Sequence, residues 1–349
     1  MNFKRIWIMF KARNYEFFRD RAAFGWNFLF PFLIIAGFAI IFGGKEYSDY
    51  KVGVFPLAQK KTDKTTLQLP DSFKNNKFIE FIGFQTEEDG INRLKHHKID
   101  FLLKNNSSDN AYWVNETSPK GYFLEQLFNG SIALKDHPVN GLKGEVHGRE
   151  IRYIDWFFPG LLGMNMMFSA LWGVGYVVVR YRKNGVLKRL KATPLTAVEY
   201  LTSQMLSRIF LLMFTLAVVW LGCDLFFSFE VVGSLVDIFI VFFIGSLSLT
   251  ALGLILASRG TSEEFTSGIL NFITWPMMFL SEVWFSIEGA PQWVQTISKA
   301  LPLTHMLSAA RKIMNDGASL LDVHTELEVM AVMALVFLII GASLFSWNS

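Results

Sequence analysis

Residues 156–179 read WFFPGLLGMNMMFSALWGVGYVVV, and no charged side chain interrupts them. A helix needs roughly 20 apolar residues to cross a hydrocarbon layer about 30 Å thick, so this stretch is long enough to span a membrane. Residues 180–195, which follow, read RYRKNGVLKRLKATPL and contain six Lys and Arg. This change from apolar to cationic sequence marks one end of a predicted transmembrane helix.

The rest of the chain has the same character. Hydrophobic residues make up 52% of the 349 residues, charged residues only 18%, and the mean hydropathy is +0.32. This composition is typical of an integral membrane protein and gives no indication of nucleic-acid binding. We therefore predict an α-helical polytopic protein with six transmembrane helices. The predicted spans are residues 22–44, 156–179, 209–229, 238–258, 265–281 and 329–349.

The distribution of Lys and Arg predicts the orientation, because these residues concentrate at the cytoplasmic ends of spans. Residues 1–21 carry six of them against two acidic residues, which places the N-terminus in the cytoplasm. The second span then returns to the cytoplasm at residues 180–195, and Arg259 follows the fourth span. Six spans leave both termini cytoplasmic, and the expected location is the bacterial inner membrane.

The N-terminal segment, residues 1–21, has an aromatic stripe. Phe3, Trp7, Phe10 and Phe17 fall on one side of a helix, and most of the cations fall elsewhere. This pattern predicts an amphipathic helix that lies in the cytoplasmic headgroup layer, before the first span at 22–44. A soluble core helix is the alternative interpretation.

Residues 45–154 are polar enough to form a separate domain on the other side of the membrane. Alternating apolar residues predict strands, and amphipathic periodicity predicts helices, so we expect a small extracytoplasmic α+β domain. The expected strands are residues 50–55, 99–104 and 111–114, and the expected helices are residues 87–98 and 118–134. Residues 155–349 then form a five-span region with a cytoplasmic loop at 180–201 and an outer re-entrant hairpin at 291–316.

The cytoplasmic loop predicts a short helix of its own. Gly185 permits a turn before it, and Pro194 ends it, because the residue before a proline is disfavoured in the helical conformation. Leu187 and Leu190 are three apart and share a face that cations flank. Two interpretations remain: an exposed apolar knob that binds a partner, or a topology signal with both leucines against lipid.

The order of elements resembles the permease subunits of type-2 ABC transporters. The stretch from Arg182 to Glu199 is similar to that family's cytoplasmic loop, R..G.L.RL..TPL....E.L. Residues 279–285 (FLSEVWF), with the later motifs PQW and LPLTH and Arg311, are similar to its fifth span and outer hairpin. The chain departs from the family at Ser281-Glu282, where Gly is frequent, and at Lys188, where an acidic residue is frequent.

The resemblance implies that the loop is a coupling helix that docks on a separate ATPase. It implies two copies of that ATPase subunit, which would bind ATP and Mg, and a permease that forms a homodimer or a heterodimer in membrane lipid. The chain itself has no G-x-x-x-x-G-K-[ST] motif, so we expect no nucleotide cofactor and no enzymatic activity. The single cysteine excludes a cysteine-rich metal site. The coupling residues implied are Gly185, Val186, Leu187, Lys188, Arg189, Leu190, Thr193, Pro194 and Glu199.

An amphipathic, lipid-like or drug-like substrate suits spans rich in Phe and Met better than a sugar phosphate does, although plain packing would also explain the methionines. The expected path residues are Met164, Met167, Phe168, Trp275, Met278 and Phe279. The expected residues of the outer gate and hairpin are Glu282, Pro291, Pro302, His305 and Arg311. An alternative function is a membrane-bound sensor with an extracytoplasmic ligand-reading domain, which would need a cytoplasmic output domain. An intramembrane enzyme is a further alternative, which would need ionisable groups at mid-membrane depth.

Overall fold

The computed structural model describes residues 2–42, 50–57, 67, 69–96, 98–105, 111–115, 118–133, 153–227, 229–258, 262–345 and 347. Arg259, which supported the predicted orientation, lies outside these residues. The chain divides into two compact units, and each is described separately. The first unit combines Met1–Gly43 with Glu150–Ser349, and the second is Gly44–Arg149.

The first unit is helical. Residues 153–183 form one continuous helix whose middle turn is a π-helix, η2. The helices of this unit are α1 (Phe3–Arg19), α2 (Arg21–Phe42), α6 (Tyr153–Leu171), η2 (Trp172–Tyr176), α7 (Val177–Lys183), α8 (Val186–Lys191), α9 (Ala197–Phe227), α10 (Leu235–Ala257), α11 (Glu263–Leu280), α12 (Gln292–Ser298), α13 (Pro302–Asp316) and α14 (His324–Leu344).

Four helices in the described part of the chain are long and apolar enough to cross a membrane. They are Tyr153–Lys183, Ala197–Phe227, Leu235–Ala257 and His324–Leu344. A fifth would arise if Phe3–Arg19 and Phe24–Phe38, which are bent by 61°, acted as one span. The protein is thus polytopic, with four to five candidate spans. Each of the six predicted windows overlaps a helix, although α9 begins at Ala197, before its window, and residues 43–44, 346 and 348–349 lie outside the described residues. That all six helices cross the membrane stays a prediction.

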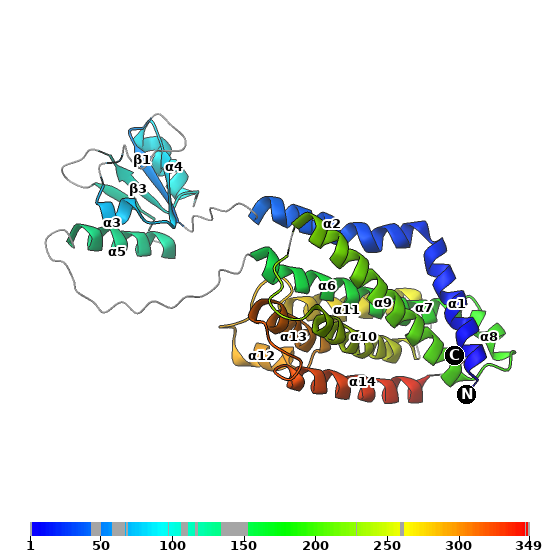
Figure 1. The fold of residues 1–349 in the computed structure, drawn as a ribbon. Helices are drawn as coiled ribbons and strands as arrows, with labels where there is room; N and C mark the ends of the chain where they lie inside the picture. The colour runs from blue at the N-terminus through cyan, green and yellow to red at the C-terminus, as the bar shows by residue number, and fades with distance from the viewer. Residues whose placement is uncertain are drawn as a thin grey trace. The chain divides into compact units, whose positions relative to one another are not determined.

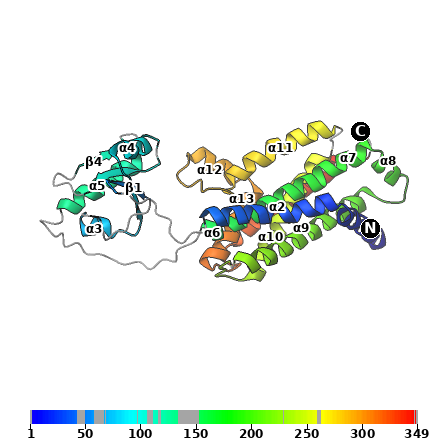
Figure 2. The ribbon, with the colours of Figure 1, turned by 90° about the horizontal axis from the view of Figure 1, so that it is seen from above.

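Helix α10 lies at the centre of the helical unit and packs against α6, η2, α9, α13 and α14. Phe242 and Leu249 of α10 are fully buried there. Gly253 allows α10 to approach its neighbour, since a Cβ at this position would lie 3.3 Å from the carbonyl oxygen of Ala170. Two views show the long helices running alongside one another, with α8 at one end and α12 at the other (Figures 1 and 2).

Local sequence sets several helix ends. The hydroxyl of Ser234 accepts a hydrogen bond from the Asp237 amide at the start of α10, and Ser262 does the same for Phe265 at the start of α11. Pro302 occupies the first turn of α13, and Gly317 ends that helix with a left-handed φ of 72°. These caps fix the ends of α10, α11 and α13.

Helix α1 packs against α9 and has two different faces. Ile6 and Asn14 are buried, and Asn14 accepts a hydrogen bond of 3.0 Å from the Ser207 hydroxyl on α9. On the predicted aromatic stripe, Phe3 is 75% exposed and Trp7 is 43% exposed. The helix is therefore amphipathic as expected, and its place in a headgroup layer stays a prediction.

The second unit contains a four-stranded sheet with strand order β2-β1-β3-β4. Strand β1 pairs in parallel with β2 and β3, with Val52 opposite both Phe81 and Phe101, and β4 is antiparallel to β3. Strand β2 and helix α3 were not predicted. The elements are β1 (Tyr50–Phe55), α3 (Asp71–Lys74), β2 (Ile79–Gly83), α4 (Glu87–Lys95), β3 (Phe101–Lys104), β4 (Tyr112–Val114) and α5 (Pro119–Ala133).

Alternation along the strands gives this sheet two apolar faces. Phe101 and Leu103 of β3 pack with Phe128 of α5, and Leu102 between them packs with Leu94 of α4. The sheet therefore lies between α5 and α4, which is a small α/β arrangement with its own core.

Candidate functional site

Helix α8 is held at the end of the helical unit by a tight turn. Asn184 ends α7, and Gly185 precedes α8 with a φ of 69°, in the left-handed region that favours glycine. At the other end the Thr193 hydroxyl donates to the Leu190 carbonyl oxygen over 2.6 Å. The predicted helix between Gly185 and Pro194 is therefore present, with bounds that local sequence sets.

The expectation that Leu187 forms an exposed knob is wrong. Its side chain has 0% exposure and packs in the chain's own core with Val178, Tyr200 and Leu254. Leu190 is half-buried beside that core. The two leucines share a face as predicted, but this face points inward because the adjacent spans offer more apolar surface than solvent does.

Glu199 is also buried, with 2% exposure, and does not form an outer contact surface. One carboxylate oxygen accepts a hydrogen bond of 3.0 Å from the Thr196 amide, and the Thr196 hydroxyl accepts one of 3.3 Å from the Glu199 amide. This reciprocal pair is a capping box at the start of α9. The T-x-x-E spacing in the sequence is the signal that could have predicted it.

Residues near both ends of the chain contact the loop after α8 and the start of α9. The Asn2 amide donates to the other Glu199 oxygen over 2.6 Å, and Arg5 donates to the Pro194 carbonyl oxygen. Near the C-terminus, the ring of Trp347 lies 5.5 Å from the ring of Tyr200. The loop is therefore part of a platform, which we define as α8, the loop 192–196, the start of α9 and the chain segments packed on it.

Helix α1 is tied to the helix that precedes α8. Arg13 donates to the Tyr181 hydroxyl over 2.8 Å and to the Gly173 carbonyl oxygen over 3.3 Å, and Tyr181 donates to Glu16. These contacts join α1 both to α7, the helix that precedes α8, and to the π-helical turn η2.

The residues of the platform that remain open to a partner are mostly polar. Lys188, Arg189, Thr193 and Pro194 are exposed, and Val186 is half-buried. Neither Lys188 nor Arg189 forms an ion pair with any residue that the structure describes. The outer surface of the platform is therefore cationic.

A cavity of about 550 Å³ lies farther along the helical unit, with walls from α2, α6, η2, α9 and α11. This size and a mainly apolar lining are typical of sites for drug-sized molecules. Its aromatic lining consists of Trp26, Phe30, Phe168, Trp172, Trp275 and Trp284.

Four of the six predicted path residues line this cavity: Met164, Phe168, Trp275 and Met278. Met167 does not line the cavity and is fully buried in the helix core.

The sixth predicted path residue, Phe279, is also absent from the lining of the cavity. Its ring lies 6.4 Å from that of Trp275 and 6.2 Å from that of Phe285, and its side chain is 44% exposed.

The sequence reasoning missed Arg208, which also lines the cavity. The charge-free window began at Ile209, so Arg208 was taken to precede the span. In the structure α9 begins at Ala197, which places Arg208 roughly 16 Å along the helix. A charged residue within a candidate span is a functional candidate by default.

Arg208 donates from Nη2 to both the carbonyl oxygen and the hydroxyl of Ser169 on α6. The Ser169 hydroxyl in turn donates to the Asn27 side chain over 3.4 Å, and Asn165 donates to the Asn27 carbonyl oxygen over 3.3 Å. A Cβ on Gly173 would overlap the guanidinium, so glycine at this position of η2 makes the space for it. Polar groups from three helices thus meet at one edge of the aromatic cavity.

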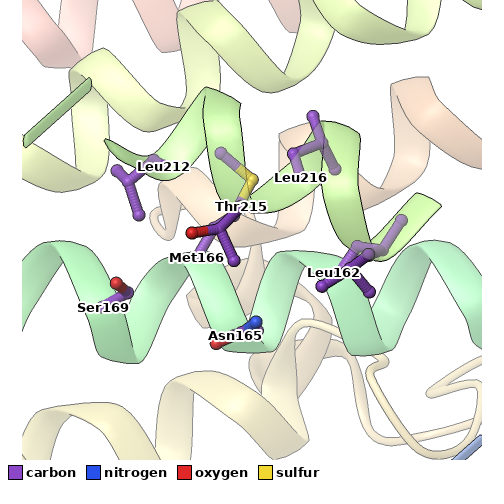
Figure 3. A pocket seen from close by; sticks show the side chains of 8 residues that line it. Leu162, Asn165, Met166, Ser169, Leu212, Thr215 and Leu216 are labelled. Atoms are coloured by element: carbon purple, nitrogen blue, oxygen red, sulfur yellow. The ribbon is translucent and has the colours of Figure 1, made fainter. Parts of the chain in front are cut away.

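A smaller hollow of about 10 Å³ lies between α6 and α9, enough space for about one water molecule (Figure 3). Figure 3 shows Asn165 and Ser169 on α6 and Thr215 on α9 among its lining side chains. Asn165 and Ser169 line both spaces, so the polar edge of the large cavity continues between the two helices.

At the end of the helical unit away from α8, Arg311 of α13 joins two other segments. Its guanidinium lies 3.8 Å from the centre of the Trp156 ring and donates to the Trp156 carbonyl oxygen over 3.1 Å. It also donates to the Glu282 carbonyl oxygen over 2.6 Å, and the Glu282 carboxylate is 3.7 Å away. Arg311 is only 8% exposed, so these contacts replace its hydration.

Glu282 has a φ of 59°, a left-handed conformation that favours glycine. Here the Glu282 carboxylate accepts a hydrogen bond of 2.9 Å from the Ile287 amide and pairs with Arg311, which offsets the strain.

The structure does not bring the other predicted hairpin residues into this cluster. Pro291 and Pro302 precede or begin α12 and α13, as expected. The His305 ring contacts the Lys299 carbonyl oxygen at 2.7 Å. Among the described residues no group of three or more His, Cys, Asp or Glu could hold a metal ion.

Comparison with known proteins identifies the class to which this fold and these sites belong. The sequence matches the family described as ABC-2 family transporter protein over residues 22–343. The chain therefore belongs to the ABC-2 transporter family, and it is a multi-pass membrane protein.

Two relatives are permeases. The chain is 26% identical to the daunorubicin resistance ABC transporter permease protein DrrB1 of Streptomyces coeruleorubidus over 191 residues, which cover 53% of this chain and 66% of that protein. It is 25% identical to the probable multidrug ABC transporter permease YbhR of Escherichia coli K12 over 167 residues, which cover 47% of this chain and 45% of the relative. The chain thus spans about half to two thirds of the length of these relatives.

Proposed function

We propose that this chain is the transmembrane permease subunit of an ATP-driven exporter that moves an amphipathic, lipid-like or drug-like substrate out of the cytoplasm or inner leaflet. The observation that carries the proposal is membership of the ABC-2 family over residues 22–343. The names of both relatives describe ABC transporter permeases, which supports the same function. Its location would be the bacterial inner membrane.

The proposed topology has six spans: α2, the continuous helix 153–183, α9, α10, α11 and α14. The unit Gly44–Arg149 then lies outside the cytoplasm, α1 lies at the cytoplasmic surface, and the hairpin of α12 and α13 dips into the outer leaflet without crossing. The contact of Asn2 with Glu199 and that of Trp347 with Tyr200 support both termini being on the same side as α8.

The proposed energy source is an ABC ATPase, of which two copies serve a permease homodimer or heterodimer. ATP and Mg would bind to the ATPase. The exposed cationic surface of the platform, Lys188 and Arg189 with Thr193 and Pro194, is the proposed docking surface. Leu187 and Glu199 are buried inside the helical unit. There they fix α8 and the start of α9 to the neighbouring helices, so that a rigid-body movement of the ATPase is transmitted to the spans.

The proposed substrate route includes the aromatic cavity between α2, α6 and α11. A cavity of about 550 Å³ with methionine and tryptophan walls fits amphipathic molecules of various shapes. The cluster of Glu282 and Arg311 would hold the outer end of α11 against α13 and α6.

Purification of the tagged full-length chain tests the central claim. We expect a protein with a G-x-x-x-x-G-K-[ST] motif to copurify, and the reconstituted pair to export substrate only with ATP. The double charge reversal Lys188→Glu/Arg189→Glu should weaken ATPase binding about tenfold, whereas the matched reversal Lys95→Glu/Lys98→Glu in the second unit should not. Absence of any ATPase from the purified chain, together with ATP-independent transport, would refute the proposal.

A further inference from the structure

We propose that the aromatic cavity selects an anionic amphiphile, and that Arg208 binds the anionic group, a carboxylate, sulfonate or phosphate. The inference rests on the proposed transport function and adds the charge of the substrate to it. Arg208 would be the residue that determines this specificity, and the aromatic walls would hold the apolar body.

The first argument is charge balance. No carboxylate that the structure describes lies within ion-pair distance of Arg208, although the residue lies within a candidate span. Charged residues inside membrane proteins are almost always paired or face a water-filled cavity, because an isolated charge in hydrocarbon is costly. Arg208 therefore has a strong preference for a negative group in the cavity that it lines.

The second argument is the use of its donors. A guanidinium has five N–H donors, and both hydrogen bonds of Arg208 come from Nη2 and go to Ser169. The Nε group is buried without a partner, and Nη1 donates to no described residue. Nε is packed against Gly173, so Nη1 is the N–H group left for an oxygen of a carboxylate, sulfonate or phosphate.

The third argument is the lining. Besides Arg208 the polar groups of the cavity are Asn27, Asn165 and Ser169, all at the same edge, and the remaining lining is aromatic or aliphatic. A cavity with one charged edge and otherwise apolar walls matches an amphipathic anion, which has a charged group and an apolar body. A cationic amphiphile would place like charge beside Arg208, which is unfavourable.

A purely structural role would also explain the contact with Ser169, since it ties α9 to the turn before η2. The two roles differ in what they need. Tying the helices needs a hydrogen-bond donor, which glutamine also supplies, whereas binding an anion needs the positive charge. Arg208→Gln and Arg208→Lys therefore separate them.

The test uses a pair of fluorescent probes with the same aromatic body: 1-anilinonaphthalene-8-sulfonate, which is anionic, and N-phenyl-1-naphthylamine, which is neutral. Binding to the full-length chain in phosphatidylcholine nanodiscs is measured as energy transfer from tryptophan, with empty nanodiscs subtracted. Arg208→Gln should weaken the anionic probe about tenfold or more and leave the neutral probe unchanged. Arg208→Lys should retain most of the preference, and Lys299→Gln, an exposed charge near α13, should change neither probe.

Equal binding of the anionic probe by Arg208→Gln and by the original chain would overturn the proposal, as would equal loss of both probes by Arg208→Gln and Arg208→Lys. Unchanged neutral-probe binding in Arg208→Gln shows that the cavity is still formed, so a folding defect is not mistaken for loss of the anion site. The assay contains no ATPase. Failure to find an ATPase partner would refute the proposed function, and failure of the charge dependence would refute only this inference.

Two sources could supply the anion. If a membrane lipid is the natural occupant, phosphatidylglycerol added to the nanodiscs should compete with the anionic probe for the original chain. If a soluble amphiphile is the occupant, phosphatidylglycerol should not compete, whereas dodecyl sulfate below its micellar concentration should.

Discussion

Leu187→Ala tests whether α8 is anchored by this chain or by its partner. The Leu187 side chain has 0% exposure and lies between Val178 of α7 and Tyr200 of α9. Truncation of a fully buried leucine to alanine costs about 2–5 kcal/mol, from lost burial and from the cavity left behind. A helix of six residues is too short to be stable alone, so this loss should fall mainly on the docking of α8.

The expected effect is local opening of the platform. Even the lower value, about 2 kcal/mol, raises the population of the open state roughly 30-fold. Hydrogen exchange of the isolated full-length chain should therefore become faster for the amides of α8, including Arg189, which donates to the Gly185 carbonyl oxygen over 3.2 Å. Exchange in the second unit, such as at Val52 in β1, should stay unchanged.

Leu190→Ala is the matched control, because Leu190 shares the face but is only half-buried. It should raise the exchange of α8 clearly less than Leu187→Ala does. If Leu187→Ala left the exchange of α8 unchanged and weakened only ATPase binding, Leu187 would be a partner contact and the assignment to the chain's own core would be wrong.

Three further predictions concern Glu199, Arg311 and the orientation of the chain in the membrane. Glu199→Ala removes a capping box and the acceptor of the Asn2 amide, so thermal unfolding followed by tryptophan fluorescence should begin at a lower temperature. An unchanged transition would contradict the role given to this carboxylate. Arg311→Lys keeps the charge but loses the planar, forked contacts at the outer end, and should lower stability by about 1–2 kcal/mol in the same assay; equal stability would show that charge alone suffices. In a chain with Cys223 replaced, a cysteine at Ser72 should react with an impermeant reagent on intact cells, and one at Asn184 should react only after lysis. Labelling of both from outside would reverse the proposed orientation.

The positions of the long helices could be predicted from the sequence because they depend on local properties. Long charge-free runs and the turn residue Gly185 act within a few residues, so hydropathy and spacing reveal them. The same holds for β1 and β3 in the second unit. Strand β2 was missed, because short apolar segments are ambiguous without their pairing partners.

What only the tertiary structure decided is the direction in which each functional side chain faces. Leu187 was predicted in the right helix but as an exposed knob, and the burial of Glu199 was not predicted, because burial depends on helices that come from distant parts of the chain. Arg208 was left out because a count of charge-free residues cannot show that α9 begins at Ala197, eleven positions before Arg208. The cavity exists only where α2, α6, α9 and α11 meet, and these contacts join residues that are far apart in sequence, so no local pattern encodes them.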